Sequence, residues 1–542
     1  MTRLLGLFIA CGVAMAASGQ VTTNPAATGG AAPPTRPAPA GPDRAGWWND
    51  RVFYEVFVRS FKDSGTGPLS GDGVGDLRGL IEQLDYLNDG TGDPGTSLGV
   101  GGLWLMPIHP SPTYHGYDVT DYLNVHAQYG TLEDFGELLR ECHRRDIRVI
   151  IDLVLNHCSD QHPWFRSARA GGEHRDWFIW QDRDPGWRGP WNQRVWHRSD
   201  QGVYYGLFSR SMPDLNFRDP GPTSAMRLVA DFWLRDQQVD GFRLDAIRHL
   251  IEEGAVQEST PATHEWLKGF QAHCKQVRPD AMTVGEVWAD TAQAASYVGG
   301  EMDMAFEFAL AQAIRDSVRA GSGEPYRRVL AKVLASYPPN QFGAFLTNHD
   351  MTRVMTELKG DPAAARLAAA IYLLGPGVPF VYYGEELGMP GDKPDPDLRT
   401  PMAWDAGEFA GFSRAKPWRQ LTPGHSTRNV AAQQADPSSL LQWYRKLIHL
   451  RRSTPALRHG VTAFLEGAPD SVVALVRESQ GEQAVVLVNC GDEPAVVTLP
   501  PIAPIETAHG IRWVGLLGPD AEHQSPSVSV APRAVRVLLR RP

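Results

Sequence analysis

Three short apolar segments end in or beside a carboxylate: VDGFRLD at 239–245, AMTVGEV at 281–287 and FGAFLTNHD at 342–350. A chain that repeatedly follows a buried strand with an acid brings several carboxylates to one rim of a parallel barrel. Convergent carboxylates are the groups that cleave glycosidic bonds. The three segments therefore predict a barrel whose rim carries acid–base chemistry.

The segments belong to a longer alternation of strand-like and helix-like stretches that starts at Trp47. Eight strands are expected, near residues 53, 103, 149, 241, 283, 303, 344 and 380. Eight β–α units in about 400 residues predict an α/β protein with a (β/α)8 TIM barrel rather than a doubly wound sheet.

Local patterns add detail to the barrel. The β-rich run Val52–Arg59 predicts one strand, and the apolar spacing over 77–87 predicts one helix. Thr131 and Asp134 have the spacing of a capping box at the start of a further helix. The stretch 439–452 has the spacing of a helix that would close the barrel.

Two segments fall outside the alternation. Residues 157–220 are too long for an ordinary loop and predict an inserted domain after the third strand. Residues 454–542 contain β-branched runs without a helical period, which predicts a C-terminal antiparallel β-sandwich. The barrel then comprises residues 47–156 and 221–453.

The inserted segment is rich in tryptophan. Packing within a small domain explains most of these rings, and flat aromatic faces also suit sugar rings, so that one or two are candidates for substrate contact. The six are Trp164, Trp177, Trp180, Trp187, Trp191 and Trp196.

The N-terminus has the features of an exported protein. Residues 1–20 place one arginine before an apolar stretch and small residues, which is typical of a signal peptide. Secretion or periplasmic export is therefore expected, with lipid anchoring through Cys11 as the alternative. Residues 21–46 are rich in proline and alanine and predict a linker.

Composition excludes several classes of partner. The apolar fraction of 42% and the charged fraction of 21% are those of a globular protein. A net charge of −10 argues against a nucleic-acid partner, which requires a basic face. Beyond the leader, no segment reaches the roughly 18 apolar residues of a membrane span. Oligomeric state is left open.

Four further cysteines match no metal or redox motif and are expected to be buried thiols: Cys142, Cys158, Cys274 and Cys490.

The strand-end residues predict distinct chemical roles. Arg243 and Asp245 are two apart on a strand and point to the same side, so the guanidinium is expected to lower the carboxylate's pKa, as a nucleophile requires. A structural ion pair is the alternative. Apolar surroundings are expected to raise the pKa of Glu286, which suits a general acid. Asp350, next to His349, would add charge stabilisation near the reacting carbon.

Taken together, the motifs resemble the α-amylase superfamily, glycoside hydrolase family 13, from about residue 47 to 542. The resemblance rests on DLVLNH (152–157), GFRLDAIRH (241–249), GEVW (285–288) and FLTNHD (345–350), with MPDLN (212–216) and GVPFVYYGEELGM (377–389) in support. MPDLN is similar to a group intermediate between oligo-1,6-glucosidases and neopullulanases.

The resemblance implies that Asp245 is the nucleophile, Glu286 the acid/base and Asp350 a third carboxylate that stabilises the distorted sugar. It implies a retaining reaction through a covalent glycosyl-enzyme. It also implies that four side chains hold the glucose unit on the non-reducing side of the cut: Tyr117, His157, Arg243 and His349.

Substrate preference is implied by further matches. Ala246 stands where relatives that cut α-1,6 bonds often carry valine, which favours α-1,4 cleavage. Arg248 and His249 resemble a basic pair on the reducing side in amylases. Asp118 and Arg399 instead resemble the clamp that favours exo action in α-glucosidases.

The expected activity is α-amylase-type hydrolysis of α-1,4 bonds in starch, glycogen or maltooligosaccharides. An exo-acting α-glucosidase or a transglycosylase of the same family is the alternative. A non-catalytic relative would lose the three acids, which this chain keeps.

The resemblance also implies a Ca²⁺ ion held by Asn156, Asp214 and the carbonyl of His249, which are oxygen ligands of the type Ca²⁺ takes. A second candidate is the aspartate loop with Asp63, Asp72 and Asp76, for which a solvated turn is the alternative. No organic cofactor is expected.

Overall fold

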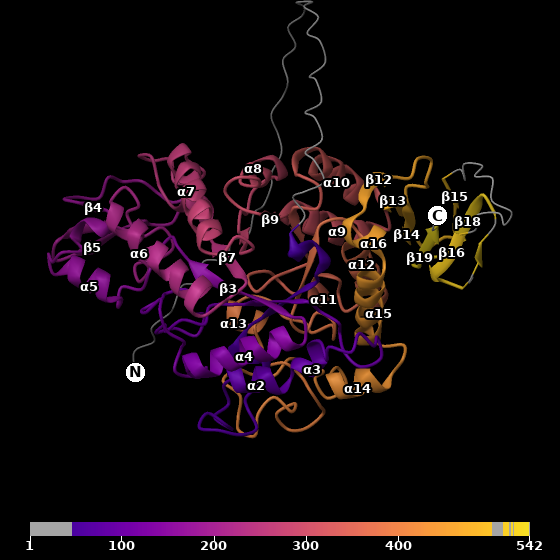
Figure 1. The fold of residues 1–542 in the computed structure, drawn as a ribbon, viewed down its shortest axis with the longest axis horizontal. Coiled ribbons are helices and arrows are strands. Elements are labelled where there is room, and N and C mark those ends of the chain that lie inside the picture. The colour runs from indigo at the N-terminus through magenta and orange to yellow at the C-terminus, as the bar shows by residue number, and fades with distance from the viewer. Residues whose placement is uncertain (1–45, 501–512, 520–521, 524, 541–542) are drawn as a thin grey trace, which may run out of the picture. The chain divides into compact units, whose positions relative to one another are not determined.

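Eight parallel strands close into a barrel in the order β1-β11-β10-β9-β8-β7-β3-β2 (Figure 1). The strands are β1 (Phe53–Val56), β2 (Gly102–Leu105), β3 (Arg148–Val154), β7 (Gly241–Asp245), β8 (Met282–Gly285), β9 (Met304–Phe306), β10 (Phe342–Ala344) and β11 (Val378–Tyr382). Each lies where the sequence predicted a strand, so the (β/α)8 barrel is confirmed.

This computed structural model describes residues 46–500, 513–519, 522–523 and 525–540. The predicted signal peptide, Cys11 and the linker up to residue 45 lie outside the described residues. Among the helices that are described, none is long and apolar enough to cross a membrane.

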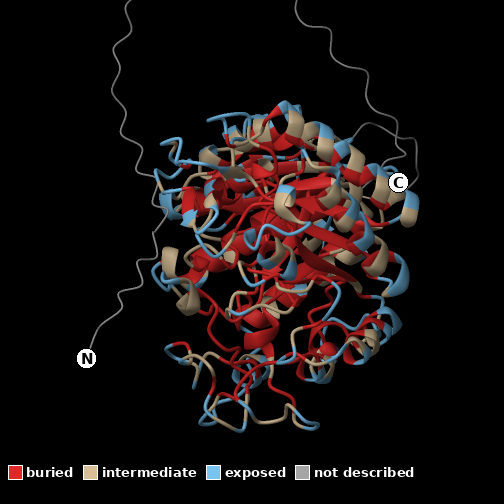
Figure 2. Ribbon diagram, turned by 90° about the vertical axis from the view of Figure 1, so that its left-hand side faces the viewer, coloured by how far each residue is buried: buried red, intermediate tan, exposed pale blue. Residues whose placement is uncertain are grey.

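Burial on both faces explains the apolar strands. One buried cluster fills the barrel interior and includes Phe53, Trp104 and Phe380, with Phe53 and Phe380 stacked at 4.7 Å. A larger cluster joins the outward faces of the strands to the helices. Parallel strands covered on both sides carry continuous rather than alternating apolar runs. Figure 2 shows the buried residues concentrated in the central strands.

Helices and short turns connect the strands. They are α1 (Val58–Phe61), α2 (Leu77–Glu82), α3 (Leu84–Leu87), α4 (Leu132–Arg144), α6 (Pro220–Asp231), α7 (Pro261–Val277), α8 (Thr291–Ala295), α9 (Phe308–Ala320), α10 (Glu324–Ser336), α11 (Val354–Glu357), α12 (Pro362–Leu374), α13 (Asp395–Leu398), α14 (Val430–Ala435) and α15 (Leu440–Ser453). The predicted capping box of Thr131 and Asp134 is present at the start of α4.

Two local predictions differ from the structure. The run predicted as one strand over Val52–Arg59 is a strand only to Val56 and then turns into α1. The helix predicted over 77–87 is divided into α2 and α3. Gln83 leaves helical geometry there, and its backbone N–H caps α2 by donating to the Leu80 and Ile81 carbonyls.

The inserted domain contains α5 (Pro163–Arg169) and a three-stranded antiparallel sheet of β4 (Trp180–Gln181), β6 (Gly202–Tyr205) and β5 (Trp196–Ser199). An antiparallel bridge between His157 and Asp214 joins the start of the inserted segment to its end. Trp196 is buried, whereas Trp191 keeps 40% of its surface exposed. The other four tryptophans of the inserted segment are partly buried.

The C-terminal region is an antiparallel sandwich, as predicted, preceded by a short helix α16 (Pro455–His459) that the sequence pattern did not predict. A six-stranded sheet and a two-stranded sheet enclose a separate apolar cluster. The strands are β12 (Val461–Phe464), β13 (Val472–Ser479), β14 (Glu482–Asn489), β15 (Ala495–Thr498), β16 (Trp513–Leu517), β17 (Glu522–His523), β18 (Ser527–Val530) and β19 (Val535–Arg540). The four predicted thiols are free and buried.

Candidate active site

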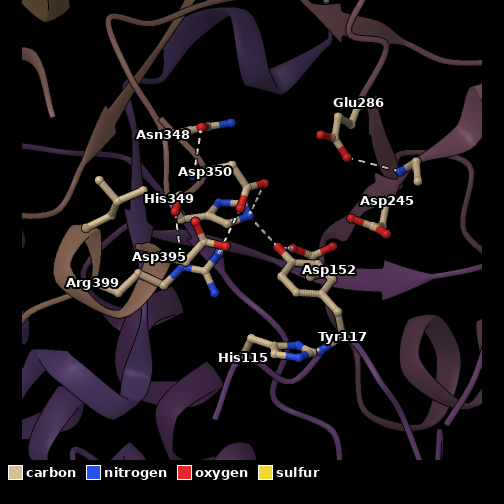
Figure 3. Close-up of polar contacts among 12 residues, drawn as sticks. His115, Tyr117, Asp152, Asp245, Glu286, Asn348, His349, Asp350, Asp395 and Arg399 are labelled. Atoms are coloured by element: carbon tan, nitrogen blue, oxygen red, sulfur yellow. Dashed lines mark hydrogen bonds and ion pairs between the residues drawn. The ribbon is translucent and has the colours of Figure 1, made fainter. Parts of the chain in front are cut away.

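The three predicted acids gather at the carboxyl ends of the barrel strands. Asp245 is the last residue of β7, Glu286 follows β8 directly, and Asp350 lies in the loop after β10. In a barrel of this kind, the loops at this end hold the reacting groups. Figure 3 shows Asp350, His349 and Arg399 grouped across from Asp245 and Glu286.

Arg243 is the cation that organises one side of the site. It is fully buried, and its Nη1 donates to Asp245 Oδ1 at 2.6 Å and to Asp152 Oδ1 at 2.8 Å. Its Nη2 donates to Glu286 Oε2 at 2.7 Å. Parallel register places Asp152 of β3 directly beside Arg243 of β7. One guanidinium therefore serves three carboxylates from neighbouring strands.

Arg243 lowers the pKa of Asp245, as predicted, but the net pKa of Asp245 is raised. Burial disfavours the Asp245 carboxylate more than Arg243 favours it, and it raises the pKa of Asp245 to about 6. Arg243 does not offset this effect, and the nearby charges of Asp152 and Asp350 raise the pKa further. For Glu286, burial raises the pKa above its ordinary value, in the direction the sequence predicted. The backbone N–H of Ala246 also donates to Glu286 at 3.1 Å.

Asp350 is surrounded by cations instead. His349 Nε2 lies 3.1 Å from Asp350 Oδ2, and Arg399 Nη2 donates to Asp350 Oδ1 at 2.7 Å. Burial opposes ionisation here as well, but His349 and Arg399 outweigh it and hold the pKa of Asp350 well below its usual range. Asp350 is therefore an anion throughout the physiological pH range.

The predicted sugar-holding residues lie on both sides of this group. Tyr117 stacks on the His349 ring at 5.6 Å, and its hydroxyl lies 2.6 Å from His349 Nε2. Asp118 is buried and accepts hydrogen bonds at 2.5 Å from the hydroxyls of Ser111 and Thr113. Arg399 is instead held by Asp350, so the structure ties Asp118 and Arg399 to different partners.

His157 and His249 are both enclosed by neighbouring rings. His157 packs on Phe208 at 5.1 Å, and burial lowers its pKa to about 3. His249 lies near Trp191 and Phe208, with Nδ1 3.0 Å from the Gln257 carbonyl. Burial lowers the pKa of His249 to about 4, so its ring is neutral near pH 7.

Arg248 is engaged by other groups of the protein. Its Nη1 donates to the Trp288 carbonyl, and its Nη2 pairs with Glu258 at 2.9 Å. Trp288 lies two residues after Glu286 and is 47% exposed. Arg248 therefore lies beside the segment that carries the predicted acid.

The first predicted calcium site has a donor set that fits the ion. Asn156 Nδ2 donates to Asp214 Oδ2 at 2.9 Å, while the buried Asn156 Oδ1 has no hydrogen-bond partner. Burial raises the pKa of Asp214 to about 8. An unpartnered amide oxygen beside a carboxylate that lacks a cation suits an oxygen-seeking ion such as Ca²⁺.

The aspartate loop is organised differently. Asp63 accepts from the backbone N–H groups of Gly71 and Gly73, Asp72 accepts from Val74, and Asp76 caps α2 and accepts from Ser64. These bonds stabilise a closed turn, in which Asp63 and Asp76 are each 1% exposed, so the turn is not the solvated one given as the alternative. Within the described ranges, no cluster of three or more His, Cys, Asp or Glu residues is placed to hold a metal.

Two residues of the site carried no predicted role. Asp152 was visible in the DLVLNH motif, and its place beside Arg243 follows from strand register. Glu55 of β1 contacts His349, with Oε1 2.5 Å from Nδ1. The sequence signal for Glu55 was an acid within an otherwise apolar strand.

Comparisons with known proteins find relatives over most of the chain. Residues 55–460 match the sequence profile of the family "Alpha amylase, catalytic domain". Alpha-amylase 3 of Dictyoglomus thermophilum is 38% identical over 452 residues, which cover 82% of this chain and 85% of that protein. Trehalose synthase of Pimelobacter sp. is 33% identical over 571 residues, covering 88% and 96%. The solved structure of α-amylase from H. orenii superposes with a TM-score of 0.78 at 36% identity, covering 91% of this chain and 99% of that one.

Proposed function

Because the chain belongs to the α-amylase family of glycoside hydrolases, we propose that it cleaves α-1,4-glucosidic bonds of starch, glycogen or maltooligosaccharides with retention of configuration. The observation that carries the proposal is the shared guanidinium of Arg243, 2.6 Å from Asp245 and 2.7 Å from Glu286. Retaining enzymes need two carboxyl groups only about 5–5.5 Å apart. One guanidinium that bonds both acids keeps them close.

In the proposed reaction, Asp245 attacks the anomeric carbon while Glu286 gives its proton to the departing glycosidic oxygen. The bond between the anomeric carbon and the glycosidic oxygen breaks, and a covalent glycosyl–Asp245 ester forms. Glu286, now ionised, takes a proton from water, whose oxygen attacks the anomeric carbon and releases Asp245. The raised pKa of Glu286 suits the first step, because the group must enter it protonated.

Asp350 supports the same reaction without exchanging a proton. Positive charge develops on the sugar ring in the transition state, and a fixed carboxylate stabilises it. Its pKa lies far below neutrality because of His349 and Arg399, so no protonation competes with this role. Tyr117 and His157 would contact the same glucose unit.

The linkage is proposed from Ala246, which follows the nucleophile as in α-1,4-cleaving relatives.

Proton NMR of the first product from maltoheptaose tests the mechanism, since retention releases the α-anomer. Early appearance of the β-anomer would exclude a covalent intermediate on Asp245.

An exo-acting α-glucosidase or a transglycosylase is the second candidate. The observation that favours it is the bond from Arg399 to Asp350, which places a guanidinium beside the sugar-facing carboxylate. A time course on maltoheptaose separates the candidates. Internal fragments at early times support endo cleavage, glucose alone supports exo cleavage, and products longer than the substrate support transfer.

A Ca²⁺ ion is proposed at Asn156, Asp214 and the His249 carbonyl, where it would join the inserted domain to the barrel. Its double charge would hold Asp214 ionised, and the ion would bind the Asn156 Oδ1 atom, which has no hydrogen-bond partner. Running the same time course with and without a chelator tests the requirement.

Export of the chain is proposed from the pattern of residues 1–20. N-terminal sequencing of the mature protein, recovered from the medium or periplasm, tests it. A lipid-modified Cys11 as the first residue would support anchoring instead.

A further inference from the structure

Glu55 places a carboxylate against the buried side of His349. Glu55 is 2% exposed and His349 is fully buried, and Glu55 Oε1 lies 2.5 Å from His349 Nδ1. An ionised carboxylate oxygen only accepts hydrogen bonds, so a protonated Nδ1 is the partner that satisfies this contact. The contact joins β1, at the start of the barrel, to the loop that follows β10.

The second ring nitrogen faces the candidate site. His349 Nε2 lies 2.6 Å from the Tyr117 hydroxyl and 3.1 Å from Asp350 Oδ2. The Tyr117 hydroxyl donates to Asp152 Oδ2 at 3.1 Å, so it acts as an acceptor toward His349. Nε2 must therefore also carry a proton. The contacts of both nitrogens are satisfied together when His349 donates from each of them.

The surroundings of His349 fix both the orientation of its ring and its charge. Tyr117 stacks on one face, and Trp104 of β2 presents its ring nearly perpendicular at 5.7 Å. The charged groups that face His349 are Glu55 from β1, Asp152 from β3, Asp350 from its own loop and Arg399, whose Nε donates to the His349 carbonyl. Burial alone would lower the pKa of His349, but Asp350 and Glu55 raise it to about 9.

We propose that Glu55 is a positioning residue of the catalytic site: its carboxylate keeps His349 doubly protonated, so that Nε2–H holds Asp350 in place for the sugar. The inference rests on the proposed function, because it assigns Asp350 to the reacting sugar. A neutral His349 would have one proton for two contacts. It would then lose its bond to Glu55, or it would turn a lone pair toward the Asp350 carboxylate.

The test replaces Glu55 with its neutral isostere in the full chain. Glu55→Gln should lower kcat on maltoheptaose, relative to wild type at the same pH, by about tenfold or more near pH 8, where His349 has lost its second proton. The ratio of the variant's kcat to the wild-type kcat should recover severalfold near pH 6, where the imidazolium of His349 re-forms in the variant. KM should change less than kcat. A purely structural defect would lower the ratio equally at every pH, and that result would overturn the proposal. A ratio close to one at both pH values would do the same.

Glu386→Gln is the matched control. Glu386 is another buried glutamate, and it accepts from Tyr54, the neighbour of Glu55 on β1, and from Tyr86. Its substitution perturbs the packing of the same strand without touching His349. The control should leave the pH dependence of kcat unchanged, and a shift equal to that of Glu55→Gln would overturn the proposal.

A second measurement does not depend on glucan hydrolysis. The pH titration of ¹³C-labelled histidine Cε1 signals, with His349 assigned from its loss in His349→Gln, reports the ring pKa directly. The His349 signal should titrate above about pH 8 in the wild type and well below that in Glu55→Gln. An unchanged titration would overturn the inference. Inactivity of the wild type on glucans would overturn only the proposed function.

If Glu55→Gln does not fold, Glu55→Asp retains the charge and takes its place. It should keep the titration of His349 near the wild-type position even where kcat falls. A titration near the ordinary histidine value in this variant would overturn the proposal.

Discussion

The Oε2 atom of Glu286 lies 2.7 Å from Nη2 of Arg243, so the predicted acid at the end of β8 is held by a cation within β7. Asp245 lies two residues further along β7 and accepts a hydrogen bond from Nη1 of the same guanidinium. Arg243 and Asp245 lie within β7, whose position is fixed by its hydrogen-bonded neighbours β3 and β8. Sites built on such elements keep their geometry better than sites built on loops.

Glu286→Gln should reduce hydrolysis of maltoheptaose by about 10²–10⁴-fold, because the amide keeps the shape but has no proton to transfer. Reducing-end assays measure the rate. Glu265→Gln serves as a control, since the Glu265 side chain is 82% exposed and has no assigned role. The activity of this variant should equal that of the wild type. More than about a tenth of the wild-type rate in Glu286→Gln would remove this residue from the acid/base role.

The pH profile of kcat/KM should be bell-shaped. Asp245 must be ionised to attack, and burial raises its pKa to about 6, so activity should fall as the pH drops through that value. Glu286 must be protonated, and burial raises its pKa, so the basic limb should lie above the ordinary glutamate range. Initial rates at low substrate concentration measure both limbs. A profile that stays flat down to about pH 4 would contradict the raised pKa of Asp245.

Stability should depend on pH through Asp214. Its folded pKa of about 8 is raised above the ordinary value of about 3.9. The stabilising contribution of the retained proton is complete below about pH 4 and is lost as the pH rises through about 8. The chelated protein should therefore unfold at a lower temperature at pH 8 than at pH 5. Ca²⁺ at 100-fold excess over its Kd should add about 2.7 kcal/mol.

Calorimetry of two variants checks the assignment to Asp214. Asp214→Asn should lose most of the Ca²⁺-dependent rise in Tm, because the anionic ligand is gone. Asp200→Asn should behave as the wild type, since Asp200 is 85% exposed on the inserted domain. An equal Ca²⁺ response in both variants would place the ion elsewhere.

Ala246 should resist replacement by valine for a backbone reason. Its φ of 49° lies in the left-handed region, where a β-branched side chain is strained. Ala246→Val should lower the free energy of unfolding by about 1–2 kcal/mol, whereas Ala246→Gly should be no less stable than the wild type. Denaturant midpoints measure both. A valine variant more stable than the glycine variant would contradict the strain argument.

Much of the barrel could be predicted because its signal is local. A strand buried on both faces is a continuous apolar run, and β2 and β11 are such runs in the sequence. The division of 77–87 into α2 and α3 was missed, because Gln83 interrupts the helix without a glycine or proline. The helix α16 was missed because five residues are too few to show a period.

The site was predicted less evenly. Asp245, Glu286 and Asp350 end recognisable segments, and the structure brings them to one rim. Glu55 belongs to no segment of this kind, and its contact partner is 294 residues away. Such a contact depends on how the barrel closes, since β1 pairs with β11 and thereby reaches the loop after β10.

Sequence by itself determined the class of fold and the identity of the acids, because both follow from residue type and spacing along single strands. Tertiary structure alone decided their charges. Arg243 lowers the pKa of Asp245 as expected, but the closed barrel presents the same guanidinium to Asp152 and Glu286 and buries Asp245. The pKa of Asp245 therefore rises to about 6, because desolvation and shared charge depend on distances that exist only after the strands close.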